Sequence, residues 1–329
     1  MNIKIVLLAL LFPLLISCHS EKENGLLPSW NDTSVKARLL QFLNDDVEQI
    51  PVADRIAVFD MDGTVVCEKP WGIETVVSLH KLAEQGETDS VVRNSVEYQF
   101  AKKLLINPRD TSVLNHTYEN GQNYLANIIL KPFDGADKEE YVKFANRCLS
   151  TAKHWEHDRT YADLFYQPML ELIAALKDRQ FQIYIVSASM QGIVWGICPQ
   201  ELGLDRSHLI GIRHPKQVHF AADGKVTYTI KAGMMSPVNS FEGKTINIYD
   251  HIGKMPVVAV GNAYSDFGMF HLTEGCGYPH VALLLHHDDA EREYVYEPTH
   301  SVNWQDTLRH YHWLQADMSK EFKEVWKKK

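Results

Sequence analysis

Two aspartates, Asp60 and Asp62, stand two residues apart directly after a short apolar run, and Gly63 follows them. Carboxylates at this spacing, on a turn loosened by a glycine, can divide the work of a nucleophile and of an acid/base. Like charges this close need a cation between them and a substrate. The pattern therefore indicates a divalent metal ion at this turn.

Two other polar clusters also follow apolar runs. Ser187-Ala188-Ser189 comes after the run FQIYIV, and a second cluster extends from Gly261 to Asp266. A hydroxyl group and free backbone amides at a turn from strand to helix make a natural cradle for phosphate. In open α/β sheets, active sites gather at the carboxyl ends of the strands. We therefore expect the three clusters to meet.

The elements that must position these clusters alternate between strands and helices. Short apolar runs predict buried parallel strands at 55–59, 181–186, 257–260 and 281–285. Apolar residues at helical spacing predict helices over 34–49 and 168–179. This alternation predicts an α/β fold with a doubly wound, Rossmann-like parallel sheet.

Two segments interrupt the alternation. Residues 67–165 are polar and mostly helical in pattern, and they predict a helical cap inserted into the core. Residues 217–230 predict a hairpin that turns at Asp223-Gly224. The expected organisation is a leader over 1–18, the N-terminal helix and start of the core over 19–66, the cap over 67–165, and the rest of the core with C-terminal helices over 166–329.

Residues 1–18 resemble an export signal. Lys4 is followed by twelve apolar residues, too few to span a bilayer, and then by Ser17-Cys18. The stretch over 15–18 resembles a bacterial lipobox, which implies lipidation of Cys18 and removal of the residues before it. An ordinary secretory signal with an incidental cysteine is the alternative. We expect a protein of the bacterial cell envelope, periplasmic or facing the outer membrane, whose only membrane contact is its lipid anchor.

Composition narrows the class of protein. A chain of 329 residues suggests about two domains, and 45% hydrophobic with 23% charged residues is typical of a globular protein. The net charge is −9, and the only basic run is Lys327-Lys328-Lys329. Nucleic acid is therefore excluded as a partner.

Four cysteines follow Cys18, and an export compartment would tolerate disulfides between them. Cys67, Cys148, Cys198 and Cys276 allow three full pairings, and no C-x-x-C motif is present. Buried free thiols are slightly favoured over bridges.

The constellation closely resembles the haloacid dehalogenase superfamily of hydrolases. That family carries D-x-D-G-T, then a serine or threonine after a strand, then a lysine, then a G-[DN]-x-x-x-D loop, and all four appear here in this order within 59–266. The sequences of four segments, 59–71, 166–173, 251–262 and 284–294, resemble those of a group of exported bacterial phosphatase-like hydrolases. Phosphoserine and phosphocholine phosphatases are more distantly similar.

The resemblance implies a role for each catalytic residue. Asp60 attacks phosphorus and becomes an aspartyl-phosphate, while Asp62 protonates the leaving oxygen and then deprotonates the hydrolytic water. Ser187 hydrogen-bonds the transferring phosphoryl group. Lys244 neutralises charge on Asp60 and the phosphate, with Lys254 as the alternative. Such phosphoryl transfer relies on positioning and charge neutralisation.

The resemblance also implies Mg²⁺, held by Asp60, the backbone carbonyl of Asp62, and the loop with Asn262 and Asp266. Many relatives have aspartate where Asn262 stands. An amide oxygen can still bind Mg²⁺, but the site has one less negative charge. We expect weaker metal affinity, with Asp266 contributing directly or through water.

Substrate contacts are expected from residues around these motifs. Glu68 would favour a cationic or amino head group, and Trp71 could stack on a quaternary ammonium. One histidine of His286-His287, assigned here to His286, is expected to line the pocket, with a hydrogen-bonded loop histidine as the alternative. The expected substrate-binding residues are Gly63, Thr64, Ala188, Glu68, Trp71 and His286.

The function expected from this resemblance is hydrolysis of a small phosphorylated metabolite outside the cytoplasm. A carbon–halogen hydrolase of the same superfamily is disfavoured by Asp62, because dehalogenases lack the second aspartate. A phosphomutase is a further enzyme alternative. An alternative from a different class is a non-catalytic, lipid-anchored binding protein with the same fold. Only Asn262 supports this alternative.

Overall fold

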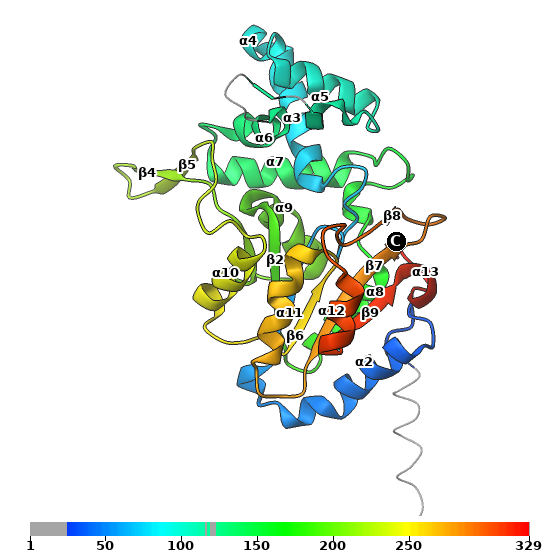
Figure 1. Cartoon of the computed structure of the whole chain (residues 1–329). Helices are drawn as coiled ribbons and strands as arrows, with labels where there is room; N and C mark the ends of the chain where they lie inside the picture. The colour runs from blue at the N-terminus through cyan, green and yellow to red at the C-terminus, as the bar shows by residue number, and fades with distance from the viewer. Residues whose placement is uncertain (1–24, 116, 119–122, 329) are drawn as a thin grey trace, which may run out of the picture.

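The computed structural model describes residues 25–115, 117–118 and 123–328. The predicted export signal and its Cys18 lie outside the described residues. Within them, the chain forms a central sheet with helices on both faces and a separate layer of helices above one end of the sheet (Figure 1). The predicted α/β class is confirmed.

The central sheet has seven strands in the order β3-β2-β1-β6-β7-β8, with β9 also paired to β7. Every pair in it is parallel except β7 with β8. The strands are β1 Ile56–Phe59, β2 Gln182–Met190, β3 Leu209–Ile212, β6 Val258–Gly261, β7 Val281–Asp288, β8 Val295–Tyr296 and β9 Leu314–Asp317. A separate hairpin consists of β4 Lys216–Phe220 and β5 Val226–Ile230.

Helices connect and cover these strands. The α-helices are α2 Ser34–Asn44, α3 Ile73–Thr88, α4 Ser90–Arg93, α5 Val96–Ile106, α6 Tyr124–Leu130, α7 Lys138–Thr151, α8 Gln167–Lys177, α9 Gln191–Leu202, α10 Glu242–Ile252, α11 Phe267–Glu274, α12 Trp304–Tyr311 and α13 Met318–Glu321. The 3₁₀ helices are η1 Asp46–Gln49, η2 Val52–Asp54, η3 Thr111–Asn115, η4 Lys131–Phe133, η5 Tyr161–Asp163, η6 Arg206–His208 and η7 Tyr264–Asp266.

Both faces of the sheet are buried, which explains why its inner strands are almost continuously apolar. On one face, Phe59 of β1 and Leu283 of β7 pack in a cluster with residues of α2, α8 and α9. On the other face, Val58 and Leu284 pack with residues of α10, α11 and α12. Alternate residues of each strand thus enter two different cores, as the strand period of two requires.

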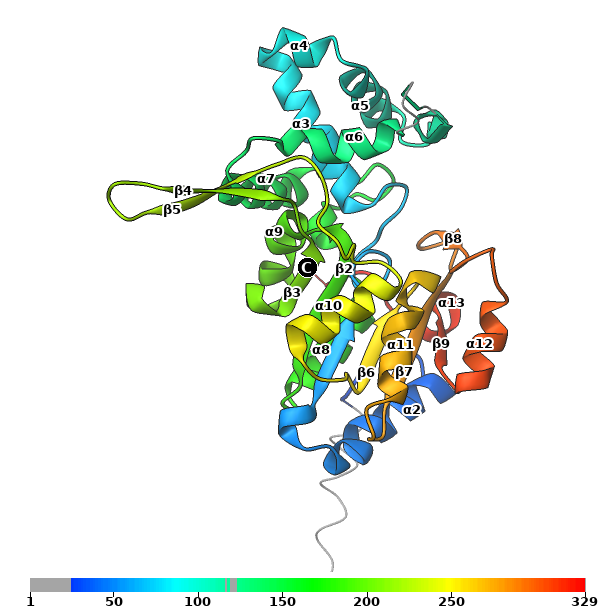
Figure 2. The same cartoon turned by 60° about the vertical axis from the view of Figure 1, so that its left-hand side comes forward.

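The helical insertion lies between β1 and β2 and contains α3 to α7, at the top of Figure 1. The hairpin lies between β3 and α10, and Figure 2 shows it projecting from the molecule beside α7. Ile230 at its end exchanges two backbone hydrogen bonds with the cap: Gly135 donates to its carbonyl, and its amide donates to Ala136. The predicted hairpin is present, with Gly224 at a positive φ of 83° in its turn. The expected limit of the cap at residue 165 stays a prediction.

Two predicted elements differ in length from the observed ones. The helix expected over 34–49 ends at Asn44 and continues as a 3₁₀ turn, where Asp45 and Asp46 put unfavourable negative charge at its C-terminus. The strand expected over 181–186 extends through Ser187 to Met190, because Met190 pairs with Ile212 after an irregularity in the register. The serine cluster is therefore the last part of a strand instead of a turn after it.

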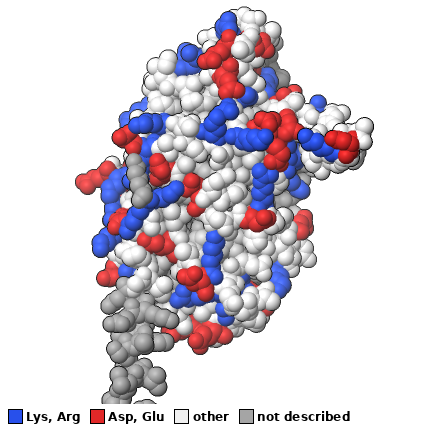
Figure 3. Space-filling model, turned by 180° about the vertical axis from the view of Figure 1, so that it is seen from behind, with Lys and Arg blue, Asp and Glu red and all other residues white. Residues whose placement is uncertain are grey.

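The structure also shows where the cysteines and the charged surface residues lie and how long the helices are. Cys67, Cys148 and Cys198 are buried free thiols as expected, whereas Cys276 is a free thiol that is only half-buried. Lysine and arginine are interspersed with aspartate and glutamate on the face in Figure 3. Over the part of the chain that the structure describes, none of the helices combines the length and apolar character needed to cross a membrane.

Candidate active site

The three polar clusters meet at the carboxyl ends of three neighbouring strands. In the central part of the sheet, Phe59 of β1 pairs with Ile185 of β2 on one side and with Val260 of β6 on the other. Each strand then continues into one cluster, which brings Asp60, Ser187 and Asn262 to the same edge. This is the edge where the sequence predicted a site.

Lys244 joins two of the clusters. It lies on α10, is 1% exposed, and donates from Nζ to Asp60 Oδ1 at 2.5 Å and to Asp266 Oδ1 at 2.7 Å. The alternative, Lys254, is exposed and instead donates to the carbonyl of Ala53 and to Asp54. The geometry therefore favours Lys244 as the cation of the site.

Burial and mutual charge set the electrostatics of this triad. Burial opposes the charge on Lys244, but Asp266 and Asp60 outweigh it and raise the pKa of the lysine, so it is a cation at neutral pH. Burial raises the pKa of Asp60, against the opposing effect of Lys244. A buried cation between two buried carboxylates is stable only while all three partners are present.

Asp62 is held by two serines of β2. Ser189 Oγ donates to its Oδ2 at 2.8 Å and Ser187 Oγ at 3.2 Å, while Oδ1 is buried without a hydrogen-bond partner among the described residues. Burial, with the charge of Glu68, raises the pKa of Asp62 to about 6. A carboxyl group with one oxygen fixed and the other free, titrating near neutrality, can give and take a proton. Sequence reasoning missed Ser189, although it stands in the same cluster as Ser187.

Gly63 and Thr64 shape the turn that carries both aspartates. Gly63 has a φ of 76°, and a Cβ there would lie 2.0 Å from Asn262 Nδ2, so only glycine fits. Thr64 is fully buried and its Oγ lies 3.2 Å from both Asp60 Oδ2 and Asn262 Oδ1. The sequence predicts that both residues bind substrate. In the structure, both contact Asn262 and so connect the aspartate turn to the loop after β6.

The loop after β6 contains Asn262, whose amide oxygen faces the site, and Asp266, whose two carboxylate oxygens both accept hydrogen bonds. Asn262 Nδ2 donates to Glu68 Oε1 at 3.1 Å, which leaves Asn262 Oδ1 facing the Asp60 side. Asp266 Oδ2 accepts from the backbone amides of Asn262 and Ala263, and its Oδ1 accepts from Lys244. In this arrangement Asn262 Oδ1 accepts from Thr64 and faces the aspartate turn, whereas Asp266 positions its loop and the lysine.

The remaining predicted substrate residues occupy different positions. Ala188 is exposed between the two serines, where its backbone can face a ligand. Glu68 is half-buried beside Gly63, at the beginning of the cap. Trp71 is nearly buried and donates from its indole nitrogen to the carbonyl of Pro108, which ties this segment to the cap.

Glu74, in the first turn of α3, is a site carboxylate that sequence reasoning missed. Its Oε1 accepts from the backbone amide of Met190 at 3.1 Å, at the end of β2. Burial and the charge of Asp62 raise the pKa of Glu74 to about 8. The helical pattern of 73–88 gives no sign of this role, because the position depends on how the cap packs on the core.

The structure corrects the histidine assignment. His286 faces away from the carboxylate loop: its Nδ1 lies 2.8 Å from Asp317 Oδ1, and its ring lies against Trp304. His286, Asp288 and Asp317 have side chains close enough to share a metal ion, but none of them contacts the aspartate turn in the described contacts. His287 is the histidine that reaches Gly63, because successive residues of β7 point to opposite faces of the sheet.

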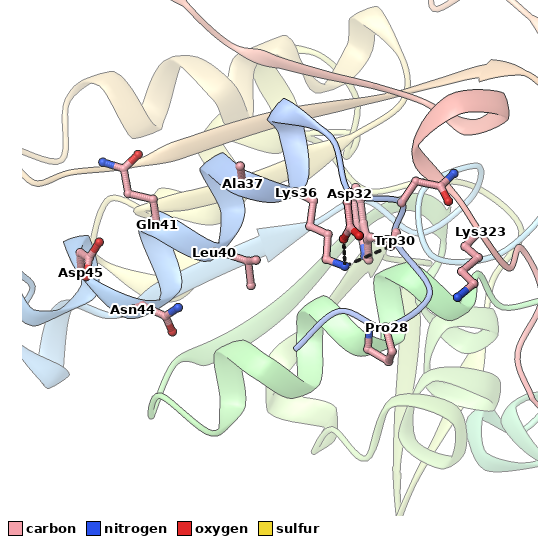
Figure 4. A pocket seen from close by; sticks show the side chains of 11 residues that line it. Pro28, Trp30, Asp32, Lys36, Ala37, Leu40, Gln41, Asn44, Asp45 and Lys323 are labelled. Atoms are coloured by element: carbon pink, nitrogen blue, oxygen red, sulfur yellow. Dashed lines mark hydrogen bonds and ion pairs between the residues drawn. The ribbon is translucent and has the colours of Figure 1, made fainter. Parts of the chain in front are cut away.

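A cavity of about 710 Å³ lies elsewhere, beside α2 (Figure 4). Lys36 crosses it and donates to Asp32 and to the carbonyl of Trp30. None of its lining residues comes from the three polar clusters. It is therefore not part of the candidate active site.

Comparison with known proteins identifies the family of the chain. The family model for haloacid dehalogenase-like hydrolases matches residues 57–271, from the first strand to α11. That range is well over half of the chain, so the chain belongs to the family of haloacid dehalogenase-like hydrolases. No curated protein matches the sequence significantly.

Several solved structures are similar to this chain at low sequence identity. A conserved protein of unknown function from Anaerococcus prevotii is 14% identical, with a TM-score of 0.51 over 86% of this chain and 90% of that one. A protein of unknown function from Bordetella pertussis is 12% identical, with a TM-score of 0.49 over 80% and 98%. A phosphoserine phosphohydrolase-like protein from Francisella tularensis is 16% identical, with a TM-score of 0.35 over 70% and 87%. At 14% identity, the Anaerococcus prevotii structure supports a likeness of fold alone.

Proposed function

We propose that this hydrolase is a Mg²⁺-dependent phosphomonoesterase that acts on a small phosphorylated metabolite through an aspartyl-phosphate intermediate. The observation that carries the proposal is the position of Lys244, whose Nζ contacts Asp60 and Asp266 at the edge of the sheet. A buried cation on a strand-end carboxylate prepares that carboxylate to meet an anionic substrate. Family membership supports hydrolysis as the reaction class.

The reaction balances with the residues present. A carboxylate oxygen of Asp60 forms a bond to phosphorus, the bond from phosphorus to the ester oxygen breaks, and Asp62 gives its proton to that oxygen. Water then attacks the phosphorus of the aspartyl-phosphate, the bond from phosphorus to the Asp60 oxygen breaks, and Asp62 takes up the water proton. Inorganic phosphate leaves and both aspartates return to their first state. The raised pKa of Asp62, about 6, suits both proton transfers.

Ser187 and Lys244 would stabilise the charge that moves during the transfer. Lys244 is held in place by two carboxylates and needs no reorganisation when the phosphoryl group arrives. Ser187 Oγ, which accepts from the amide of Ser189 at 2.9 Å, is fixed at the end of β2. Ala188, the exposed residue between the two serines, would add its backbone amide to the same cradle.

The donor set also fits Mg²⁺, which prefers carboxylate and carbonyl oxygens. Asp60 Oδ2 and Asn262 Oδ1 both lie 3.2 Å from Thr64 Oγ, so the two oxygens face the same small region. Asp60, the backbone carbonyl of Asp62 and Asn262 would hold the ion, with Asp266 orienting their loop. Bound there, Mg²⁺ would neutralise charge on the phosphoryl group.

Two carboxylates at the beginning of the cap support a proposal for the substrate class. Glu68 precedes α3 and Glu74 lies in its first turn, and both are close enough to Asp62 for their charges to interact with it. We propose that they favour a head group with an ammonium or several hydrogen-bond donors. Trp71, three residues after Glu68 and tied to the carbonyl of Pro108, would then close the head-group region as part of the cap.

We also propose that the protein is exported and anchored through Cys18. This proposal rests on the sequence of residues 1–18 alone. Labelling of growing cells with a radioactive fatty acid should mark the wild-type chain and not Cys18→Ser. Equal labelling of both would refute the anchor without affecting the proposed activity.

The activity is tested on residues 19–329 with an aryl phosphate, at acid and neutral pH. We expect phosphate release that requires Mg²⁺, stops with chelator, and is absent from Asp60→Asn. A panel of aminoalkyl, sugar and glycerol phosphates then tests the head-group proposal, with aminoalkyl phosphates expected to give the highest kcat/KM. Folded, metal-loaded protein without turnover on any phosphomonoester would contradict the phosphatase proposal and favour the binding-protein alternative.

A further inference from the structure

A buried histidine lies directly behind the turn that carries the two aspartates. His287 Nε2 is 2.7 Å from the carbonyl oxygen of Gly63, and its side chain is 1% exposed. A carbonyl oxygen can only accept, so Nε2 carries a hydrogen and donates it to Gly63. The contact joins the end of β7 to the aspartate turn, 224 residues apart in the sequence.

The other ring nitrogen of His287 faces a carboxylate that is fully satisfied. Nδ1 lies 2.9 Å from Glu293 Oε2, which also accepts from the amide of Tyr294. Glu293 Oε1 accepts from Tyr166 Oη at 2.8 Å and from Cys67 Sγ at 3.3 Å. A buried pair of this kind adds little net stability over apolar packing, yet each of its hydrogen bonds is made.

A second branch leads from His287 to the loop after β6. The ring of Tyr296 stacks on His287 with centroids 4.2 Å apart and planes at 18°. Asn262 Nδ2 lies 3.4 Å from Tyr296 Oη, besides its contact with Glu68. The same imidazole thus supports Gly63 directly and Asn262 through one aromatic ring.

Both supported groups touch each other. A Cβ on Gly63 would overlap Asn262 Nδ2, so the turn and the amide already pack without space between them. A small movement of either one changes the distance between Asp60 and Asn262. Whatever fixes both at once fixes the spacing of the oxygens that face the proposed ion.

We propose that His287 and Glu293 form a positioning pair that sets the spacing between the aspartate turn and Asn262, and thereby the affinity for Mg²⁺ and the rate of turnover. Neither side chain is among the groups proposed to hold the substrate or the ion, so the pair would act through Gly63 and Asn262. This inference rests on the proposed function, and it assigns a role to two residues outside the four family motifs.

The test uses side chains that keep one contact at a time. His287→Gln keeps a donor near the position of Nε2, His287→Asn keeps a donor only on the Nδ1 side, and His287→Leu keeps neither. His286→Gln is the matched control, because the neighbouring histidine faces Asp317 on the other side of the sheet. Each variant is measured for Mg²⁺ affinity by calorimetry, for kcat and KM on an aryl phosphate, and for thermal stability.

We expect His287→Asn and His287→Leu to lower Mg²⁺ affinity and kcat by about 10–100-fold, as loss of outer-shell partners does in metal sites. KM should change little, His287→Gln should recover most of the loss, and His286→Gln should resemble the wild type. Folded Leu and Asn variants with wild-type Mg²⁺ affinity and kcat would overturn the proposal. So would a Gln variant as impaired as Leu, since that points to a purely structural role.

Two further measurements keep the outcome decisive. If His287→Leu does not fold, Glu293→Gln takes its place and should weaken Mg²⁺ binding in the same direction; unchanged binding would overturn the proposal. Calorimetry measures the affinity for Mg²⁺ without any need for turnover. A wild type that binds Mg²⁺ but hydrolyses nothing would end the phosphatase proposal, while the variants would still decide the positioning role.

Discussion

Asn262 donates from Nδ2 to Glu68 Oε1 over 3.1 Å, and this contact orients the amide so that Oδ1 faces the aspartate turn. A residue at the beginning of the cap therefore decides which atom of a core loop is presented to the site. A carboxylate at this position would need no such orientation, because its two oxygens are equivalent. The amide carries no charge, and its orientation depends on a neighbour.

Substitution of Asn262 should therefore weaken the metal site. Asn262→Ala removes the oxygen that faces Asp60, and we expect Mg²⁺ affinity to fall by at least about tenfold, roughly 1.4 kcal/mol. Glu68→Gln keeps an acceptor for Nδ2 and should lose less affinity than Glu68→Leu. Calorimetric titration of the three variants checks this, and tighter binding by Asn262→Ala would contradict the assignment.

Gly63 should not tolerate even one added carbon. Gly63→Ala combines a positive φ with a Cβ placed against Asn262, whereas Gly224→Ala in the hairpin turn has a positive φ with nothing within 4 Å. We expect Gly224→Ala to cost about 1 kcal/mol of stability, and Gly63→Ala to cost about 2 kcal/mol more. Urea unfolding of both variants measures the difference, and equal costs would show that the packing around Gly63 yields.

Removal of the buried cation should destabilise the fold in a pH-dependent way. Lys244→Met leaves Asp60 and Asp266 buried without their partner, at a cost of about 3–5 kcal/mol near neutrality. Burial holds the pKa of Asp60 above its ordinary value, and loss of Lys244 removes the charge that opposes this, so the folded variant binds more protons than the unfolded chain. Its deficit in the free energy of unfolding should therefore be smaller at pH 5 than at pH 8 and grow as pH rises between them.

The matched control for this measurement is Lys254→Met. Lys254 follows α10, is exposed, and pairs with Asp54 at the surface. Such a pair is worth at most about 1 kcal/mol. Denaturant unfolding at pH 5 and pH 8 should separate the two lysines, and a pH-independent deficit in Lys244→Met would show that Asp60 stays ionised without its partner.

Ser189 should set the pH at which Asp62 works as an acid. Its hydroxyl donates to Asp62 and stabilises the ionised form, against the burial that raises the pKa of this carboxyl to about 6. Ser189→Ala should raise that pKa by roughly half to one unit, the equivalent of about 1 kcal/mol. Protonated Asp62 would then persist to higher pH, and the alkaline limb of kcat/KM should shift upward.

The pH–rate profile of Ser189→Ala is compared with that of Ser90→Ala, an exposed serine in α4. Only the former should move the alkaline limb. A shift toward lower pH in Ser189→Ala would mean that the hydroxyl does not favour the carboxylate, and would remove Asp62 as the group that the limb reports.

The site residues that could be predicted from the sequence are those that stand at the carboxyl end of a predicted strand. Asp60, Ser187 and Asn262 each follow an apolar run, and parallel strands bring such positions together whatever the rest of the chain does. Lys244 could be named from motif order, but its preference over Lys254 needed the helix in place. The helix ending at Asn44 and the strand reaching Met190 show how local charge and a register irregularity move the boundaries.

Residues placed by long-range packing could not be found in this way. Glu74 enters the site only because the first cap helix docks against the end of β2, which no local pattern encodes. The choice between His286 and His287 depended on the length of β7. Since β7 continues to Asp288, His287 shares a face with Leu283 and Leu285, and that face meets the aspartate turn.

The hairpin between β3 and α10 gives the cap a further attachment to the core. Two chain segments join cap and core side by side, as the bridge between Val66 and Phe165 shows, and α7 packs on α9, where Asn146 Nδ2 donates to the carbonyl of Gly196. The backbone bonds of Ile230 to Gly135 and Ala136 add a contact from a segment that runs on to Lys244. A large rotation of the cap must therefore break those bonds or pull on the segment that leads to the lysine. Opening of the cap and disassembly of the charged triad are in this way mechanically coupled.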